Sequence, residues 1–330
     1  MAGQPHCGRR ERPGADAVGP ATASQAGMAG GDRIMSRSML EVEGNRIEIT
    51  HPDKMLWPAP GIRKADYLQK LVQLAPYLLR YCSGRRLTAI RFPDGVGGKS
   101  FYQKNAPEPT PEFVAIAEVD GVRYINLNSL STLLWLGNLG VLEFHPSFDK
   151  IGDGMPGEWV LDIDPSEETR PRLMEAGSLI GEALDGMGIA AVPKTSGATG
   201  IQIVTPLAKP YTFGQLRSLG SFLGHYLSDK YPRLFTVERS IRARRGRIYI
   251  DYVQHAAGKS LSAPYTPRGR AVATVSTPLT WDEVRGEADP QAFTLLTIGD
   301  RLQRMGDLLA AAEPQNLDAV LEFTAKRAEA

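Results

Sequence analysis

Two aspartates, Asp162 and Asp164, stand two positions apart in the segment Val-Leu-Asp-Ile-Asp-Pro. Side chains alternate along a strand, so both carboxylates face one side while Leu161 and Ile163 face the other, apolar side. Neighbouring carboxylates repel each other unless a cation lies between them. Hard oxygen ligands at this spacing suit Mg²⁺ or Mn²⁺. Because Asp-x-Asp is common, an ordinary strand that ends in an Asp-Pro turn remains an alternative interpretation.

A third acid, Asp251, follows a basic segment and lies in the apolar sequence Ile-Tyr-Ile-Asp-Tyr-Val. A carboxylate in such a strand is costly to bury unless it is paired or binds a metal. A structural salt bridge to Arg247 or to a neighbouring residue is the alternative interpretation. The basic segment Arg239–Arg247 includes Arg244 and Arg245 and favours contact with phosphates.

A glycine-containing segment, Lys-Thr-Ser-Gly-Ala-Thr-Gly-Ile-Gln-Ile, predicts a strand, a small loop and a second strand. Gly197 and Gly200 allow backbone N–H groups to turn inward around an anion. The hydroxyls of Ser196 and Thr199 add further donors. The segment lacks the spacing of a Walker A loop. An ordinary glycine-rich hairpin turn is the alternative interpretation.

Further basic side chains occur at positions suited to binding phosphate. Arg268 follows a proline in the turn Ala-Pro-Tyr-Thr-Pro-Arg, and a rigidly held guanidinium suits phosphate recognition. Lys54 and Lys64 precede a predicted helix, whose N-terminus also attracts phosphate. Together with the acids and the glycine loop, these cations are typical of a two-metal nucleotidyltransferase.

Adjacent aromatic residues, Phe101 and Tyr102, stand close to Lys104. Nucleic-acid bases stack on such rings, although packing in the core is the more common role of either ring. The two interpretations remain open on the sequence alone.

Composition narrows the class of protein. The chain has 330 residues with a net charge of +1, two cysteines and five histidines. The two cysteines exclude a disulfide scaffold and a thiolate zinc finger, and no apolar segment is long enough to span a membrane. Residues 54–104 and 236–270 nevertheless carry local charges of +8 and +6, against −5 in residues 271–330. This pattern indicates a surface for a polyanion, or else simply solvated charged faces.

The elements that must position these residues mix helices and strands without a regular βαβ repeat, which predicts an α+β fold. Apolar spacing predicts helices over residues 63–81, 130–139, 169–187, 213–230, 301–312 and 316–327. Strand signals occur over residues 40–49 (a hairpin), 87–92, 100–104, 159–163, 190–194, 201–205 and 248–253. Residues 1–38 lack an apolar period and are predicted to be a disordered extension, with no secretory signal.

Seven motifs in order give the chain from about Leu40 to Asp300 a specific resemblance: H-P-D-K-M-L-W-P, R-F-P-D-G with S-F-Y-Q-K, L-E-F-H-P, L-D-I-D-P, K-T-S-G-A-T-G, Y-I-D-Y and A-P-Y-T-P-R. The chain resembles the polymerase domain of bacterial ligase D, in the archaeo-eukaryotic primase superfamily. The resemblance implies a two-lobed fold with a mixed α/β N-terminal lobe over residues 39–155. A catalytic lobe with an RRM-like antiparallel sheet would follow over 156–300, and a helical extension over 301–330.

The resemblance also implies an activity. It implies a template-directed nucleotidyltransferase that extends or fills DNA ends in non-homologous end joining. Such an enzyme uses two ions of Mn²⁺ (or Mg²⁺), takes NTP or dNTP substrates and favours ribonucleotides. Asp162, Asp164 and Asp251 match the catalytic and metal-binding acids of the family.

The resemblance assigns roles to further residues. Residues that match the nucleotide-binding positions are His145, Ser196, Gly197, Thr199, Gly200, Gln202 and Arg268. Residues expected to bind the DNA end or its 5′-phosphate are Lys54, Lys64, Phe101, Tyr102, Lys104, Arg244 and Arg245.

Two positions depart from the family pattern: Gln202 replaces a histidine, and Thr199 replaces a lysine found in some members. Both changes remove positive charge from the expected triphosphate site. All three acids are present, so catalysis is still expected. The alternative is a DNA-end-binding module with weak or vestigial polymerase activity, and an Asp-x-Asp glycosyltransferase is a third interpretation that leaves the basic residues unexplained.

The sequence also carries expectations about partners. A ligase nucleophile needs a Lys-x-Asp-Gly setting, and the segment Lys150-Ile-Gly-Asp-Gly154 has the wrong spacing. Ligation is therefore expected from a separate DNA ligase, with a Ku-like protein as a further partner. The resemblance implies a cytoplasmic, nucleoid-associated bacterial protein that binds double-stranded DNA ends with a 5′-phosphate.

Overall fold

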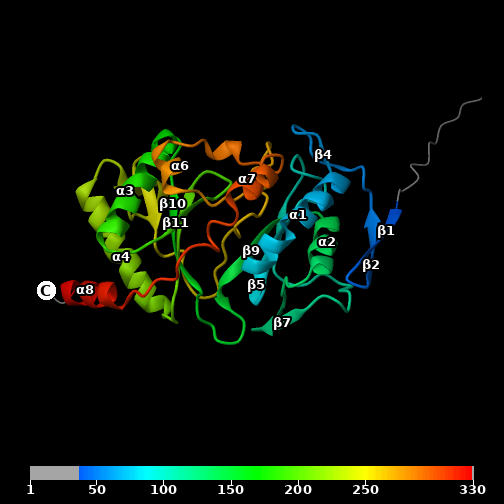
Figure 1. Cartoon of the computed structure of the whole chain (residues 1–330), viewed down its shortest axis with the longest axis horizontal. Coiled ribbons are helices and arrows are strands. Elements are labelled where there is room, and N and C mark those ends of the chain that lie inside the picture. Colours follow the sequence, from blue (N-terminus) through cyan, green and yellow to red (C-terminus); the bar gives the residue numbers. More distant parts are fainter. Residues whose placement is uncertain (1–36, 329–330) are drawn as a thin grey trace, which may run out of the picture. The chain divides into compact units, whose positions relative to one another are not determined.

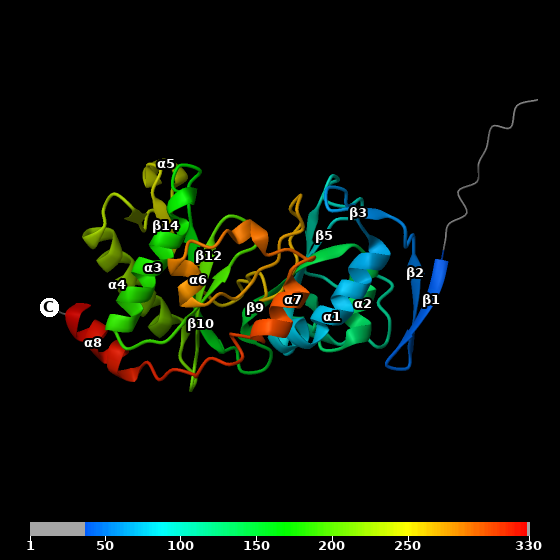
Figure 2. The same cartoon turned by 45° about the horizontal axis from the view of Figure 1, so that its top comes forward.

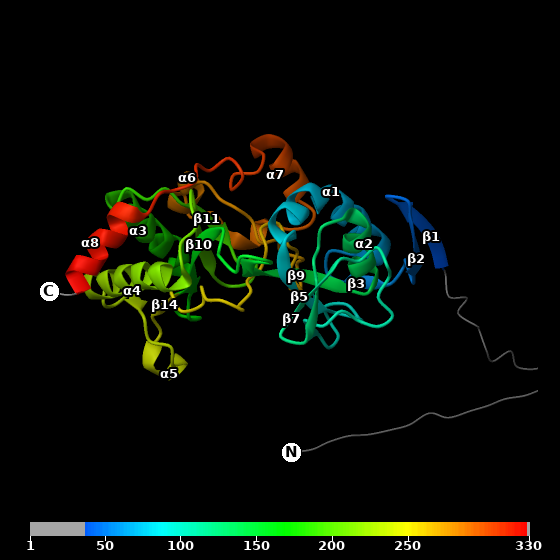
Figure 3. The same cartoon turned by 90° about the horizontal axis from the view of Figure 1, so that it is seen from below.

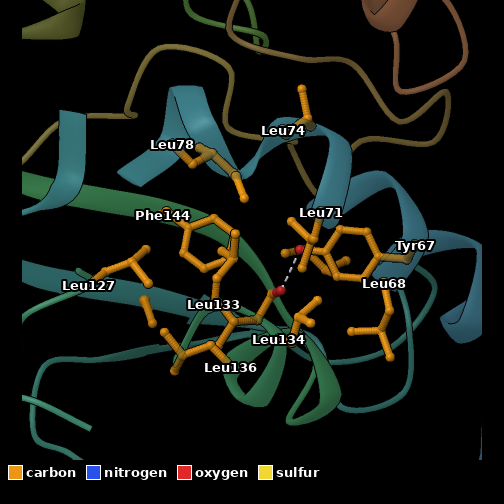
Figure 4. Close-up of a cluster of buried hydrophobic side chains, with 14 of the residues drawn as sticks. Tyr67, Leu68, Leu71, Leu74, Leu78, Leu127, Leu133, Leu134, Leu136 and Phe144 are labelled. Carbon is orange, nitrogen blue, oxygen red and sulfur yellow. Dashed lines mark hydrogen bonds between the residues drawn. The ribbon is translucent and has the colours of Figure 1, made fainter. Parts of the chain in front are cut away.

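Residues 37–328 are described by a computed structural model (Figure 1). They are built around two principal hydrophobic cores. The first core lies under helices α1 (Lys64–Cys82) and α2 (Leu130–Asn138), which pack on the sheet β6-β5-β9. Its strands are β5 (Arg85–Arg91), β6 (Phe101–Gln103) and β9 (Val141–Lys150). The apolar face of α1 enters this core because its leucines recur at helical spacing, as Figure 4 shows for Leu68, Leu71, Leu74 and Leu78.

Small antiparallel ladders surround the first core. They are formed by β1 (Arg37–Val42) with β2 (Asn45–Thr50), by β3 (Met55–Trp57) with β4 (Ile62–Arg63), and by β7 (Ile116–Val119) with β8 (Val122–Ile125). Tyr67 of α1 is fully buried in the first core. Its hydroxyl donates a hydrogen bond to the carbonyl of Val141 at 2.7 Å. The buried polar group is therefore satisfied within the core.

The second core lies between a five-stranded sheet and two long helices. The strand order is β11-β12-β10-β14-β13, antiparallel except for the β13–β14 pair. The strands are β10 (Glu158–Asp164), β11 (Val192–Thr195), β12 (Ile201–Pro206), β13 (Phe235–Thr236) and β14 (Ile248–Asp251). Helices α3 (Leu173–Gly186) and α4 (Phe213–Lys230) cover one face (Figures 1 and 2). Leu161 and Ile163 point into that helical layer, so the opposite face carries Asp162 and Asp164.

Short elements complete the chain: η1 (Arg170–Arg172), α5 (Ile241–Arg244), α6 (Trp281–Arg285), η2 (Pro290–Ala292), α7 (Ile298–Met305) and α8 (Asp318–Ala328). After the second sheet the chain returns to the first core, where Tyr265, Val275 and Ile298 are buried. Helix α7 accordingly lies beside α1 (Figure 3). Both cores therefore hold residues from the segment predicted to belong to the catalytic lobe.

Most of the predicted elements are confirmed, including the hairpin at residues 37–50 and the helices α1, α2, α3 and α4. The predicted helix over residues 301–312 is wrong in extent, because α7 begins at Ile298 and ends at Met305. Gly306 follows it with φ +67° and donates its N–H to the carbonyl of Leu302, which stops the helix. The predicted extension 1–38 lies outside the described residues except for its last two, which belong to β1.

Strand β9 was not predicted, although the motif L-E-F-H-P lies inside it. Nearly all of its ten residues are buried or half-buried, and Pro146 argues against a strand. One signal could have revealed it: polar residues alternate with apolar or bulky ones at Glu143, His145, Ser147 and Asp149.

Candidate functional site

The three predicted acids lie on neighbouring strands of the second sheet, β10 and β14. Asp162 of β10 lies directly opposite Asp251 of β14, and Asp164 lies opposite Tyr249. Burial and the charge of Asp164 raise the pKa of Asp162 to about 7. Burial also raises the pKa of Asp164, although the charge of Arg244 acts in the opposite direction. The sheet thus concentrates negative charge that a cation would neutralise.

The donor chemistry of this cluster fits a divalent ion, because three carboxylates are the hard ligands that Mn²⁺ and Mg²⁺ prefer. Within residues 37–328, however, no three His, Cys, Asp or Glu side chains converge as in a finished metal site. The support for a cation is therefore the set of donors and their mutual repulsion.

Gln202 lies directly opposite Asp162 on the other side of β10. Its amide nitrogen donates to Asp162 Oδ1 at 3.2 Å, and its amide oxygen accepts from the ammonium of Lys194. The side chain is almost fully buried. Gln202, expected to bind nucleotide, therefore contacts a predicted metal-binding acid in this structure.

The glycine loop between β11 and β12 is held by the hydroxyl of Ser196. That oxygen accepts hydrogen bonds from the N–H groups of Ala198 and Gly200, both at 3.1 Å. The N–H groups of Gly197 and Thr199 donate to no atom of the described chain. Two backbone donors of the loop are thus unused by the described chain, and their use by an anion stays a prediction.

Both glycines permit close approaches that a side chain would block. A Cβ atom on Gly200 would lie 2.3 Å from the carbonyl oxygen of Ile163, which precedes Asp164 on β10. A Cβ on Gly197, whose φ is +67°, would lie 2.7 Å from Cγ of Arg268. The loop therefore lies against the end of β10 and against Arg268.

Glu143 of β9 connects several of the expected nucleotide-binding residues. Its carboxylate accepts from His145 Nε2 at 2.9 Å, from Arg268 Nε at 2.8 Å and from the N–H of Gly269 at 2.9 Å. Arg268 also donates to the carbonyl of Ser196 in the glycine loop. Glu143 lies in the motif L-E-F-H-P but was not predicted to be a site residue; its alternation with His145 was the available signal.

The basic segment around α5 lies next to the acids. The guanidinium of Arg244 stacks on the ring of Tyr249, with 3.9 Å between Cζ and the ring centroid. Arg247 donates to main-chain carbonyls of α5. Among the described residues, the guanidinium of Arg247 is used by these carbonyls and forms no salt bridge to Asp251. Arg245 follows α5 with φ +50°.

The two lysines expected to hold a 5′-phosphate differ in their surroundings. Lys54 forms an exposed ion pair with Asp94 at 3.0 Å. Lys64 is buried, and its ammonium donates to the carbonyls of Thr50 and Asn138 at 2.7 and 2.9 Å. Burial and the charge of Lys54 lower the pKa of Lys64 to about 8.

The aromatic pair lies at the edge of the first sheet. Phe101 and Tyr102 of β6 are 45% and 73% exposed, so neither ring serves as core packing. The guanidinium of Arg91 lies 5.3 Å from the ring centroid of Phe101, and Lys104 is exposed beside them. The pair is therefore available for stacking.

The α+β fold and the cluster of three acids, glycine loop and arginine define the class of nucleotidyl-transferring proteins. The chain belongs to the LigD primase-polymerase domain family, whose model matches residues 63–309. It accordingly has the archaeo-eukaryotic primase fold, and nucleotidyl transfer is its general chemistry.

Several known proteins are similar to this chain. The bifunctional non-homologous end joining protein LigD of Bacillus subtilis is 35% identical over 288 residues, which cover 86% of this chain and 47% of that protein. The multifunctional LigD of Mycolicibacterium smegmatis is 32% identical, over 83% of this chain and 36% of that protein. The chain thus spans less than half of the length of each of these two relatives.

A solved structure has a similar fold. The polymerase domain of Mycobacterium tuberculosis ligase D, in complex with DNA, gives a TM-score of 0.74 at 29% identity. The match covers 82% of this chain and 99% of that one. Across residues 37–328, no helix has the length and apolar character to cross a membrane.

Proposed function

We propose that this chain is a template-directed nucleotidyltransferase that extends or fills DNA ends in non-homologous end joining. The observation that carries the proposal is the placement of Asp162 directly opposite Asp251, with Asp164 next to the glycine loop. The names of the similar proteins, which refer to end joining, support the same biological role.

Asp162, Asp164 and Asp251 would hold two ions of Mn²⁺ (or Mg²⁺). When bound, such ions lower the pKa of a primer 3′-hydroxyl and neutralise charge on the triphosphate. The free N–H groups of Gly197 and Thr199 would donate to phosphate oxygens of an NTP or dNTP. Ribonucleotides are the proposed preferred substrates, as the family resemblance implies.

Arg268 would contribute charge to the same phosphates. Its Nε and Nη1 atoms hold Glu143 and the Ser196 carbonyl, and in the described chain Nη2 donates to no protein atom. The guanidinium is thereby fixed with one donor group left for a ligand. His145 lies beside it, held by the same carboxylate.

The DNA end would contact the aromatic pair Phe101 and Tyr102 and the nearby Lys104. Stacking on an exposed ring requires no base-specific hydrogen bonds, which suits a protein that accepts varied ends. The cations Lys54, Lys64, Arg244 and Arg245 would contact phosphates. The similar solved structure is a complex with DNA, which supports a DNA partner here. A separate ligase and a Ku-like protein remain proposed partners.

Primer extension tests this function. The substrate is a duplex with a 3′ overhang and a recessed 5′-phosphate, supplied with Mn²⁺ and either ribo- or deoxyribonucleotides. Asp162→Asn and Asp164→Asn should abolish addition, whereas Asp185→Asn, an exposed aspartate on α3, should not. Absence of addition by the wild type, with 5′-phosphate-dependent binding retained, would favour the end-binding module instead.

A further inference from the structure

One row of side chains crosses four neighbouring strands of the second sheet. Lys194 on β11 pairs with Gln202 on β12, which pairs with Asp162 on β10, which pairs with Asp251 on β14. Directly opposed residues in antiparallel strands lie on one face, with Cβ atoms roughly 4.5–5.5 Å apart. The row therefore runs from a buried lysine to the predicted metal-binding acids.

Lys194 is 2% exposed and uses its donors within the protein. Its ammonium donates to Oε1 of Gln202, to Oγ of Ser276 at 2.6 Å and to the carbonyl of Ser262 at 3.2 Å. Ser276 in turn donates its own hydroxyl hydrogen to the carbonyl of Thr195 at 2.8 Å, so its oxygen is left to accept. The ammonium is thus held in one place by a defined set of acceptors.

This arrangement determines which end of the Gln202 amide faces Asp162. An ammonium has donors only and an ionised carboxylate has acceptors only. Between the two, the amide is satisfied in one orientation, with its oxygen toward Lys194 and its nitrogen toward Asp162 Oδ1. Without Lys194, the buried amide oxygen of Gln202 would lose its donor, and the amide would no longer be held against the carboxylate.

We propose that Lys194 is a positioning residue for Asp162 and acts through the amide of Gln202. The proposal rests on the proposed function in one respect, namely that Asp162 binds a divalent cation. Partners of metal ligands in the outer shell typically change metal affinity tenfold to a hundredfold when they are removed. Lys194 and Gln202 together occupy that outer shell for Asp162.

Two variants that both remove the charge of Lys194 separate positioning from simple charge. The charge of Lys194 repels a metal cation but also favours the ionised form of Asp162, so loss of the charge alone does not fix the sign of the change in Mn²⁺ binding. If charge alone mattered, Lys194→Met and Lys194→Gln would change Mn²⁺ binding equally. If Lys194 orients the amide instead, Lys194→Met weakens Mn²⁺ binding more, because glutamine keeps a donor.

The test measures the Mn²⁺ affinity of the full chain from the electron paramagnetic resonance signal of free Mn²⁺. Lys194→Met should weaken binding about tenfold. Lys194→Gln, which keeps a donor without the charge, should retain most of the affinity and also serves if Lys194→Met fails to fold. In a Gln202→Leu background, Lys194→Met should cause no further weakening.

Three results would overturn the proposal. Lys194→Met could bind Mn²⁺ as tightly as the wild type or more tightly, or it could weaken binding equally in the Gln202→Leu background. Asp162→Asn could also leave Mn²⁺ binding unchanged, which would place the measured ion elsewhere. If the expected affinity pattern appears while the wild type extends no primer, the polymerase proposal fails and the role of Lys194 stands.

Discussion

Glu143 and Arg268 form a buried ion pair with 2.8 Å between Glu143 Oε2 and Arg268 Nε, although they lie 125 positions apart. Burial alone raises the pKa of Glu143, but the hydrogen bond from His145 and the charge of Arg268 outweigh it and lower the pKa to about 2. The carboxylate therefore stays ionised and holds Arg268 against the glycine loop.

Glu143→Gln should destabilise the fold at neutral pH by about 1–3 kcal/mol, because it leaves the half-buried Arg268 without its charged partner. A depressed pKa contributes stability that is present above the ordinary value of 4.5 and is lost as the pH falls toward 2. The difference from the wild type should therefore shrink in acid. Urea unfolding at several pH values measures this, and a difference independent of pH would contradict it.

Asp162→Asn should abolish primer extension and yet stabilise the protein. A raised carboxylate pKa costs stability once the pH exceeds the ordinary value of 3.8, and the cost grows until the pH passes about 7. At about pH 8 the variant should thus be more stable by up to about 4 kcal/mol, since a rise of about 3 pKa units costs about 1.4 kcal/mol per unit, with little difference near pH 4. Thermal unfolding at both pH values is the measurement, and a less stable variant at pH 8 would be the opposing result.

Gly200→Ala should disrupt the contact between the glycine loop and β10, because the added Cβ would lie 2.3 Å from the Ile163 carbonyl. We expect destabilisation of about 1–3 kcal/mol and a loss of nucleotide affinity. Gly186→Ala is the matched control, since no atom lies within 4 Å of its added Cβ at the end of α3. Equal effects of both substitutions on nucleotide binding would show that the close approach is unimportant.

Phe101→Ser combined with Tyr102→Ser should weaken binding to DNA ends by roughly tenfold or more without lowering stability, because stacking contributes about 1–3 kcal/mol per base. Both rings are exposed, so their loss leaves no cavity. Phe323→Ser on α8 is a control with an equally exposed ring, 51% accessible. Fluorescence anisotropy with labelled duplexes measures binding, and unchanged affinity in the double variant would exclude a stacking role.

Lys54→Met and Lys64→Met should differ in their effect on the stability of the fold, although both are expected to weaken binding of the DNA 5′-phosphate. Lys54 is paired at the surface, so its loss should weaken binding of 5′-phosphorylated ends relative to 5′-hydroxyl ends with little change in melting temperature. Lys64→Met should also destabilise the protein by about 1–3 kcal/mol, because the carbonyls of Thr50 and Asn138 lose the donor that buried Lys64 supplies. Indistinguishable melting curves for the two variants would argue against this structural role of Lys64.

Local sequence patterns were sufficient to predict much of this protein. The alternation in β10 placed Asp162 and Asp164 on one face, and the spacing of leucines predicted α1 and α4. The glycines between β11 and β12 likewise marked a turn, in which Gly197 has φ +67°. These features depend on residues a few positions apart, whose periodicity is determined by the geometry of strands and helices.

Tertiary structure decided what the acids and cations contact. Nothing in the local pattern around Gln202 indicates that it faces Asp162, or that Lys194 lies behind it. The pairing of Glu143 with Arg268 is similarly invisible in the sequence. Such contacts depend on the register between strands and on the return of the chain to the first core, and both are fixed by the packing of residues far apart in the sequence.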